Sequence, residues 1–239
     1  MLRESDVGAV DLADSDKVVA GDMAIAIGNA QGYGIATSSG IVSVDSEYIT
    51  MTAPDEITRV SYRVMRIDTA VNPGNSGGGL YDATGNLIGI VNAKFVDDDV
   101  ENIGYAIPSN AVATIADNII DYCYGTEIER AQRAEIGIRV TVSDSKAVYD
   151  SEAGTYTIRE TVSVKDISTG SPTDGLLQVG DVLLRMEWNG AVVNIDRQYH
   201  VVDAMMDFRP GDTVRVTLLR EGVETTVDIL VTEDCLTVY

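Results

Sequence analysis

The segment from Asn72 to Gly78 reads Asn-Pro-Gly-Asn-Ser-Gly-Gly, and its residue types are the ones in this 239-residue sequence best suited to chemistry. A tight turn of this composition can expose the hydroxyl of Ser76 and bring backbone amides together beside it. Acyl transfer needs that geometry, because the hydroxyl attacks a carbonyl and nearby N–H groups stabilise the oxyanion that forms. The amides of Gly74 and Ser76 would be the donors. Gly, Asn, Pro and Ser are also the common residues of surface turns, so the segment alone leaves a nucleophile and an ordinary turn both open.

Short β-strands are predicted around this serine. Residues 22–28, 40–44 and 86–93 are apolar or β-branched runs bounded by turn residues, which is typical of antiparallel barrels and sandwiches. A helix is predicted over residues 109–121, because its apolar residues recur with the spacing of an amphipathic helix. Those residues are Val112, Ile115, Ala116, Ile119 and Ile120.

The second half is predicted to be a smaller β-rich domain. A polar and charged stretch, residues 125–135, is predicted to be a linker. Strands resume at Ile136, and one helix is predicted from about Asp196 to Phe208, where Pro210 and Gly211 end it.

The longer segment from Arg66 to Leu80 resembles the nucleophile segment of HtrA/Deg-type serine proteases, the PDZ-bearing branch of the trypsin-like fold. Four more blocks resemble strands of that family in the same order, at residues 21–29, 40–43, 89–92 and 103–108. The resemblance implies a serine endopeptidase of protein quality control, which cleaves unfolded proteins or proteins with exposed termini.

The fold implied by this resemblance is mainly β. Residues 1–124 would form the C-terminal β-barrel of a chymotrypsin/trypsin-like protease, closed by the helix at 109–121. The linker, 125–135, would lead into a PDZ domain over residues 136–239, a small β-barrel with helices.

The PDZ assignment depends on the block from Gly175 to Leu183, which is similar to the G-L-x-x-G-D-x-[IL] block of PDZ domains. Ile136, Gly137 and Ile138 stand where the family places its carboxylate-binding loop. By resemblance, their amides would hold a peptide C-terminus while the peptide adds a strand to the sheet edge. The helix would present two side chains to the ligand, Val201 and Met205, for which core packing is the alternative interpretation.

Substrate preference is also implied by resemblance. Trypsin-like enzymes that select Lys or Arg carry an acid six residues before the nucleophile, and here that position is Ala70. We therefore expect Ala70 and Val71 to line a pocket for small or medium aliphatic side chains. Asp68 is expected to be structural.

A histidine base and an orienting aspartate are needed for serine hydrolysis by this fold. In the family both lie on an N-terminal barrel, upstream of the block with which this sequence begins. The sequence has one histidine, His200, at the start of the predicted PDZ helix. We expect this chain to supply the nucleophile and the oxyanion hole, and to be inactive by itself. The alternative is an inactive pseudoprotease and PDZ module that binds peptide C-termini.

The net charge of −21 excludes several partners. Nucleic-acid binding needs clustered Lys and Arg, and an anionic membrane would repel this surface. Two cysteines without a Cys/His cluster predict neither a zinc site nor another cofactor. The expected partners are polypeptide substrates and peptide C-termini, and the resemblance leaves open a homo-oligomer of a longer protein. It also implies a place in the cell envelope or the secreted space.

Overall fold

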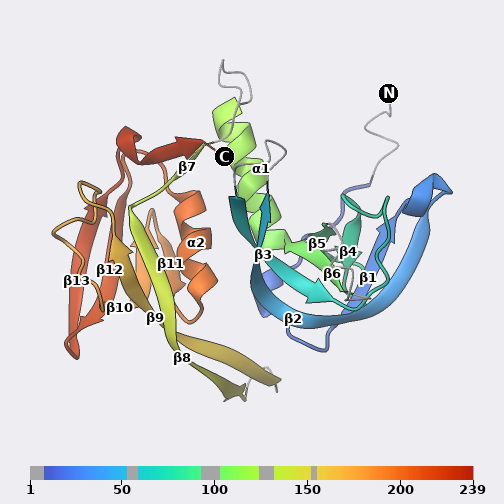
Figure 1. Cartoon of the computed structure of the whole chain (residues 1–239), viewed down its shortest axis with the longest axis horizontal. Helices are drawn as coiled ribbons and strands as arrows, with labels where there is room; N and C mark the ends of the chain where they lie inside the picture. Colours follow the sequence, from blue (N-terminus) through green and yellow to red (C-terminus); the bar gives the residue numbers. More distant parts are fainter. Residues whose placement is uncertain (1–7, 53–58, 93–102, 124–131, 152–154, 239) are drawn as a thin grey trace. The chain divides into compact units, whose positions relative to one another are not determined.

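The computed structural model describes residues 8–52, 59–92, 103–123, 132–151 and 155–238 (Figure 1). The chain divides into two compact units, residues 1–113 and 114–239, so the boundary lies within helix α1 (Ser109–Cys123). The first part of the expected linker, residues 125–131, lies outside the described residues. The end of that linker forms a short strand, β7 (Gln132–Ala134).

The first unit contains a closed β-barrel, in the strand order β1-β2-β3-β6-β5-β4. Its strands are β1 (Met23–Gly28), β2 (Ala36–Thr52), β3 (Arg59–Ile67), β4 (Gly79–Tyr81), β5 (Leu87–Val91) and β6 (Gly104–Pro108). All neighbouring strands are antiparallel, and β1 closes the barrel by pairing with both β2 and β4.

Side chains that point inward from the strands form the apolar core of this barrel. In β1, Ala24 and Ala26 are buried, whereas Met23 and Ile27 are exposed. The same core contains larger side chains from β2, β3, β4, β5 and the loop before β4. These are Val42, Met65, Ile67, Val71, Leu80, Ile88 and Val91. Burying one face of each strand fixes the register of the barrel, because a slip by one residue would expose that face.

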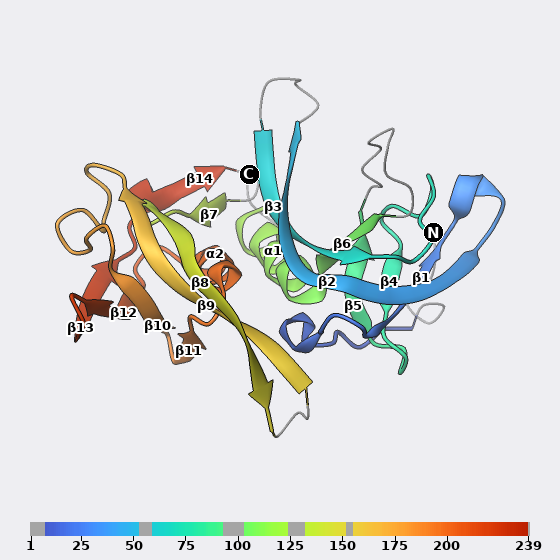
Figure 2. The ribbon, with the colours of Figure 1, turned by 60° about the horizontal axis from the view of Figure 1, so that its bottom comes forward.

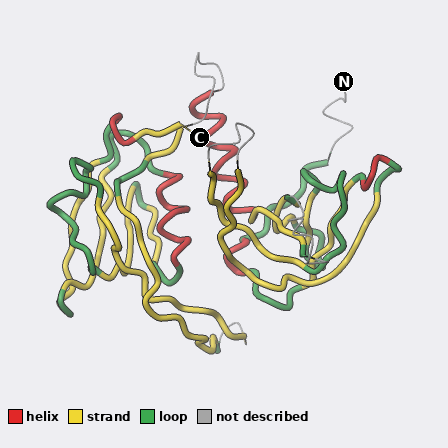
Figure 3. Tube along the Cα trace, viewed as in Figure 1, coloured by secondary structure: helices red, strands yellow, loops and turns green. Residues whose placement is uncertain are grey.

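The second unit is built on a separate sheet, in the order β13-β12-β10-β9-β8, with β11 paired to β10 (Figure 3). Its strands are β8 (Ile138–Asp150), β9 (Thr155–Ile167), β10 (Val182–Trp188), β11 (Ala191–Asn194), β12 (Thr213–Arg220) and β13 (Val223–Leu230). Helix α2 (Gln198–Asp207) lies beside this sheet, and β14 (Leu236–Val238) pairs with β7. Strand β8 is therefore an edge of the five-stranded path.

An apolar core and an ion pair with a buried carboxylate contribute to holding this second unit together. Trp188 packs edge-on against Phe208 with ring centroids 5.1 Å apart, inside a core that takes side chains from the sheet and from α2. Asp181 is only 2% exposed, and its carboxylate accepts two hydrogen bonds from the Arg220 guanidinium, at 2.7 and 2.9 Å.

Helix α1 forms close to the expected bounds, yet its buried face differs from the expected one. Ile119 and Ile120 are exposed, whereas Asn118 is fully buried. The side-chain amide of Asn118 donates to the Met206 carbonyl at 2.9 Å, within the second unit. The apolar spacing predicts that Asn118 lies on the exposed face of the helix, but the structure buries it. No helix among the described residues is long and apolar enough to span a membrane.

Candidate functional site

Ser76 lies on an exposed loop between β3 and β4 of the barrel. Hydrogen bonds to β5 hold the loop immediately after it: the Gly77 N–H donates to the Val91 carbonyl, and the Val91 N–H donates to the Gly78 carbonyl, both at 2.8 Å. The Gly78 N–H also donates to the Asn75 carbonyl at 2.9 Å. Ser76 is thus an exposed residue on a loop that hydrogen bonds attach to β5.

The backbone of this loop leaves two amides free. Asn75 donates its N–H to the Asn72 carbonyl at 3.0 Å, which closes a turn, and Gly74 has φ +102°, a conformation that glycine adopts without strain. Among the described residues, no acceptor pairs with the N–H of Gly74 or of Ser76. Two unpaired donors beside an exposed hydroxyl are the elements of an oxyanion hole.

Close packing supports the loop from the side of β1. A Cβ atom added to Gly78 would lie 2.3 Å from the Ile27 carbonyl oxygen and 2.9 Å from the Asn75 carbonyl oxygen, so only glycine fits there. Asn75 is buried, and no donor among the described residues reaches its side-chain oxygen. The residue before the serine is therefore held inside the barrel wall.

The segment leading into the loop is fixed by Asp68 and Ala70. The Asp68 carboxylate accepts the Ile41 N–H at 2.6 Å, and the Ala70 carbonyl accepts the Ser38 hydroxyl at 2.8 Å. Ala70 itself is exposed, but Val71 is buried in the barrel core. Of the two residues expected to line a specificity pocket, Ala70 alone faces outward.

The only histidine of the sequence belongs to the second unit. His200 lies in α2, where its Nδ1 atom is 3.3 Å from the Asp196 backbone N–H, and its ring packs against Tyr199. These contacts are what a structural histidine makes at the start of a helix.

A second candidate site lies at the N-terminal end of β8. Ile138 opens this strand and pairs with Ile167, while Ile136 is fully buried in the core. The Thr173 hydroxyl donates to the Ile136 carbonyl at 2.8 Å, and the Gly137 carbonyl accepts the Ser168 N–H at 2.8 Å. Among the described residues, no acceptor pairs with the N–H groups of Ile136 and Gly137. The carbonyls of this loop are therefore anchored, while two of its amides have no acceptor among the described residues.

The open edge of β8 continues this second site next to α2. Met205 is partly buried against the core, whereas Val201 is completely buried within it. The Gln198 side chain lies 3.5 Å from the Val140 carbonyl oxygen, which places the start of α2 close to the first residues of β8. Of the two helix residues expected to contact a ligand, Met205 keeps some exposed surface, whereas Val201 belongs to the core.

The described residues contain no group of three His, Cys, Asp or Glu side chains that could hold a metal ion. The two cysteines are free thiols, Cys123 partly exposed and Cys235 buried.

Comparison with known proteins assigns a family to both units. Residues 1–90 match the trypsin-like peptidase domain, and residues 134–231 match the PDZ domain. The serine protease Do-like HtrA of Bacillus subtilis is 32% identical to this chain over 225 residues. The chain belongs to the HtrA family of trypsin-like serine proteases with a PDZ domain. The mainly β fold, a protease barrel followed by a PDZ domain, is thereby confirmed.

Other HtrA proteins match over nearly the whole chain. The periplasmic pH-dependent serine endoprotease DegQ of Escherichia coli is 33% identical over 224 residues, which are 91% of this chain and 45% of that protein. The Bacillus protein is matched over 90% of this chain and 47% of its own length. The chain thus spans about half the length of the curated HtrA relatives it matches.

Solved HtrA structures agree with this family. The HtrA-type protease AlgW with a tripeptide is similar to the chain with a TM-score of 0.59 and 28% identity, over 99% of this chain and 71% of that one. AlgW with a decapeptide gives a TM-score of 0.55 and 28% identity, over 97% of this chain and 66% of that one. The named relatives in this family are serine endoproteases, so the assignment to an enzyme family is confirmed.

Proposed function

We propose that this chain is the nucleophile-bearing and peptide-binding part of an HtrA-type serine endopeptidase that acts on unfolded proteins or proteins with exposed termini. The observation that carries the proposal is the loop around Ser76. It presents an exposed hydroxyl next to the unpaired amides of Gly74 and Ser76, and β5 holds it in place.

In this proposal Ser76 Oγ attacks the carbonyl carbon of a substrate peptide bond. A histidine takes the hydroxyl proton, and an aspartate orients that histidine. The electron pair of the carbonyl moves onto its oxygen, where the Gly74 and Ser76 N–H groups donate to it. Collapse of this intermediate expels the amine, which receives the proton from the histidine, and leaves an acyl group on Ser76. The base and its aspartate come from residues outside this sequence, because His200 is its only histidine.

Substrate choice next to the scissile bond is proposed to involve Ala70. It is exposed, carries no charge, and stands six residues before the nucleophile. A neutral wall of this size favours small or medium aliphatic side chains over Lys or Arg. Val71 would support the wall from within the core rather than contact the substrate.

The second unit is proposed to bind polypeptide C-termini. The unpaired amides of Ile136 and Gly137 would hold the terminal carboxylate, and the peptide would add a strand to the open edge of β8. Ile138 and Met205 would contact the last side chain. The solved structures of AlgW are named as AlgW with a tripeptide and AlgW with a decapeptide, which supports a peptide ligand here.

We expect peptides with a free C-terminus to bind this chain at least about tenfold more tightly than the same peptides with a C-terminal amide. An amide loses the negative charge and one acceptor, and charge-assisted hydrogen bonds are roughly twice as strong as neutral ones. Isothermal titration of one peptide in both forms checks this expectation. Equal affinities would contradict the assignment of residues 136–138 to a carboxylate loop.

We expect a fluorophosphonate probe to label the purified 239-residue chain no faster than the Ser76→Ala variant. Without a histidine base the serine hydroxyl is a weak nucleophile, and the oxyanion hole alone gives only residual catalysis. Gel fluorescence against time checks this, with trypsin as the positive control. Rapid labelling that disappears in Ser76→Ala would show that these residues hold a complete catalytic group.

The cell envelope is the proposed location. The relatives DegP and DegQ are named periplasmic, and the peptides of damaged envelope proteins are suitable substrates for such an enzyme. The proposed partners are polypeptides, and the net charge of −21 disfavours nucleic acid and anionic lipid as partners.

A further inference from the structure

The hairpin of β8 and β9 is longer than the sheet to which it belongs (Figures 1 and 2). The two strands pair from Ile138 and Ile167 as far as Asp150 and Thr155, whereas β9 pairs with β10 only at Ser163. Residues 146–150 and 155–159 extend beyond this junction and have no other described strand beside them. We call these residues the hairpin arm.

The base of the hairpin arm is fixed to the start of α2. The Glu160 carboxylate accepts the Gln198 N–H at 2.7 Å and forms an ion pair with Arg197 at 3.5 Å. The Glu160 backbone N–H donates to the Asp196 carbonyl at 2.7 Å. The hairpin arm therefore begins where α2 begins, which is also where the proposed peptide groove between α2 and β8 ends.

One face of the hairpin arm continues the inner face of the sheet. Successive even-numbered residues of β9 share a face, because side chains alternate along a strand. Val162 and Val164 on that face are buried in the core, and the Glu160 side chain reaches α2. Tyr156 and Ile158 follow on the same face, beyond the helix, where no described element of the unit covers them.

This inner face of the hairpin arm is apolar and exposed. Tyr149 lies opposite Tyr156 with the ring centroids 5.2 Å apart, and Ala147 lies opposite Ile158. Tyr149, Tyr156 and Ile158 are 56%, 66% and 42% exposed. The extra residue of β8 at the irregularity between Val142 and Asp144 keeps Ala147 and Tyr149 on the side of the groove.

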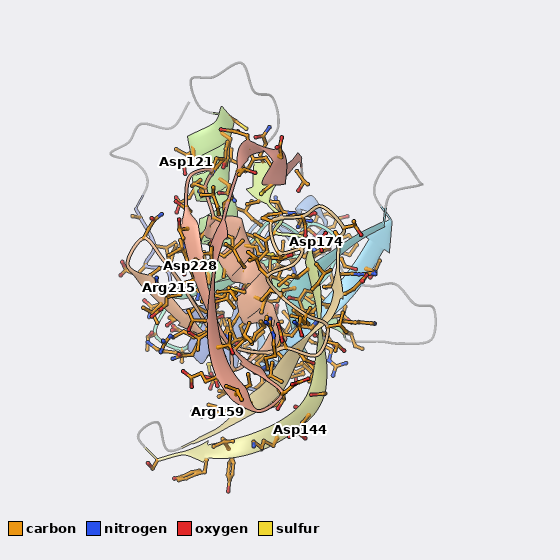
Figure 4. All side chains as sticks on the ribbon, turned by 90° about the vertical axis from the view of Figure 1, so that its left-hand side faces the viewer. Asp121, Asp144, Arg159, Asp174, Arg215 and Asp228 are labelled. Carbon is orange, nitrogen blue, oxygen red and sulfur yellow. The ribbon has the colours of Figure 1, made fainter. Side chains whose placement is uncertain are left out.

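Without a further strand, the hairpin arm is only weakly stabilised. A two-stranded hairpin without a third strand is at best marginally stable in water. On the outer face, Lys146 lies directly opposite Arg159, and like charges at such positions are destabilising, although Arg159 also forms an exposed ion pair with Asp196 at 4.0 Å. Figure 4 shows Arg159 at this part of the hairpin. A third strand along the open edge of β8 would pair with its free backbone groups, pack side chains next to Tyr149 on the apolar face and stabilise the hairpin arm.

We propose that this third strand is the upstream part of the polypeptide whose C-terminus binds at residues 136–138. This inference rests on the peptide-binding part of the proposed function. The terminal carboxylate lies where β8 begins, so the preceding residues of the ligand run along β8 toward Asp150, antiparallel to the strand. Ligand and β8 both advance about 3.3 Å per residue, so Tyr149 comes to lie beside the residue about ten positions before the C-terminus.

The substrate class follows from this register. The chain selects extended C-terminal tails of about a dozen residues, with apolar or aromatic side chains about eight to eleven positions before the end. Short tails bind the groove alone. A terminus that is packed into a folded protein cannot offer so long an extended tail, so the hairpin arm favours polypeptides whose C-terminal segment is unfolded or frayed.

A selection from random peptides tests this proposal, because it identifies the positions of the C-terminal tail at which residue type affects binding. A library of 14-residue random peptides with free C-termini is selected on the whole 239-residue chain carrying Ser76→Ala. The same library is selected on a second protein that adds Tyr149→Ser and Tyr156→Ser. The control adds Val192→Ser and Val223→Ser, which replace exposed apolar residues of other strands in the same unit.

With the intact hairpin arm we expect preferences in two regions, the last four or five positions and the positions eight to eleven before the end. The tyrosine variants should keep the first preference and lose the second, while the control variants keep both. Preferences confined to the last five positions in every protein would overturn this inference and leave the proposed function standing. No preference at any position would overturn both.

Affinities of selected peptides give the size of the effect. For the intact chain, a 14-residue peptide should bind about tenfold more tightly than its own last five residues, because several cross-strand pairs add to the contact. In the protein with both tyrosine substitutions, the 14-residue peptide and its last five residues should bind with affinities within about twofold of each other. An unchanged gain in these variants would place the upstream contacts elsewhere and contradict the proposal.

Discussion

Replacing Asp181 by Asn is expected to lower the free energy of unfolding of the second unit by about 2 to 3 kcal/mol. The Asp181 carboxylate is buried and accepts two hydrogen bonds from Arg220 and one from the Gln178 N–H. A neutral amide cannot replace this bidentate pair and leaves the Arg220 charge without its partner. Urea unfolding followed by fluorescence checks the expectation, because Trp188 is the only tryptophan of the sequence and lies in this core.

The destabilisation should depend on pH in a defined direction. Burial by itself would raise the pKa of Asp181, but the hydrogen bonds from Arg220 and Gln178 outweigh it and place the pKa below its ordinary value. A carboxyl group with a lowered pKa in the folded state stabilises the fold above its unfolded pKa, about 3.9, and loses that contribution as the pH falls through the folded value. The difference between the original chain and Asp181→Asn should therefore be full at pH 7 and shrink below about pH 4.

A matched control is the exposed pair of Arg215 and Asp228 on β12 and β13 (Figure 4). It has the same bidentate geometry, but both side chains are about half exposed. Asp228→Asn should leave the urea midpoint nearly unchanged, because solvent screens such pairs. Equal losses from the two substitutions would show that burial is not the source of the Asp181 effect.

Replacing Gly78 by Ala is expected to destabilise the first unit by about 2 to 3 kcal/mol and to displace the loop that carries Ser76. The new methyl group would meet two backbone carbonyl oxygens, those of Ile27 and Asn75, which cannot rotate away as a flexible side chain would. Moving the loop breaks the hydrogen bonds that Gly77 and Gly78 make with Val91. Hydrogen exchange measured on peptides covering residues 70–91 should show faster exchange of these amides.

Gly8→Ala is the control for this substitution, because a Cβ atom there meets nothing within 4 Å. It should change neither exchange at residues 70–91 nor stability by more than about 0.5 kcal/mol. The urea midpoint reported by Trp188 fluorescence follows the second unit. It should be the same in the original chain, in Gly78→Ala and in Gly8→Ala. Normal protection of residues 70–91 in Gly78→Ala would contradict the packing described for this loop.

Much of the fold follows from local patterns in the sequence. Short apolar runs bounded by turn residues predict β1 and β5, and the apolar spacing at 109–121 predicts α1 within two residues of its observed end. The buried face of α1 could not be predicted in this way. Asn118 is buried because the Met206 carbonyl, 88 residues later in the sequence, accepts its amide. A hydrogen bond between distant segments leaves no periodic signal.

Part of the candidate site could likewise be predicted from local sequence, and part of it could not. Residue types and spacing are sufficient to single out Ser76 and Gly74, because glycines next to a serine restrict the backbone locally. The role of Gly78 as the one residue that fits against Ile27 depends on the closure of the barrel through β1 and β4. The hairpin arm could not be predicted either, since the sequence shows two β-branched runs but not that β10 stops short of them.

The measurement that tests the central claim most directly is the site of a fluorophosphonate adduct on the native protein. The protein is captured from its source cells with an antibody raised against this chain, after the probe has reacted, and is digested with trypsin. We predict that mass spectrometry finds the adduct on Ser76, in the peptide that runs from Ile67 to Lys94. An unmodified Ser76, in a sample whose other serine hydrolases are labelled, would contradict the protease and favour the inactive peptide-binding module.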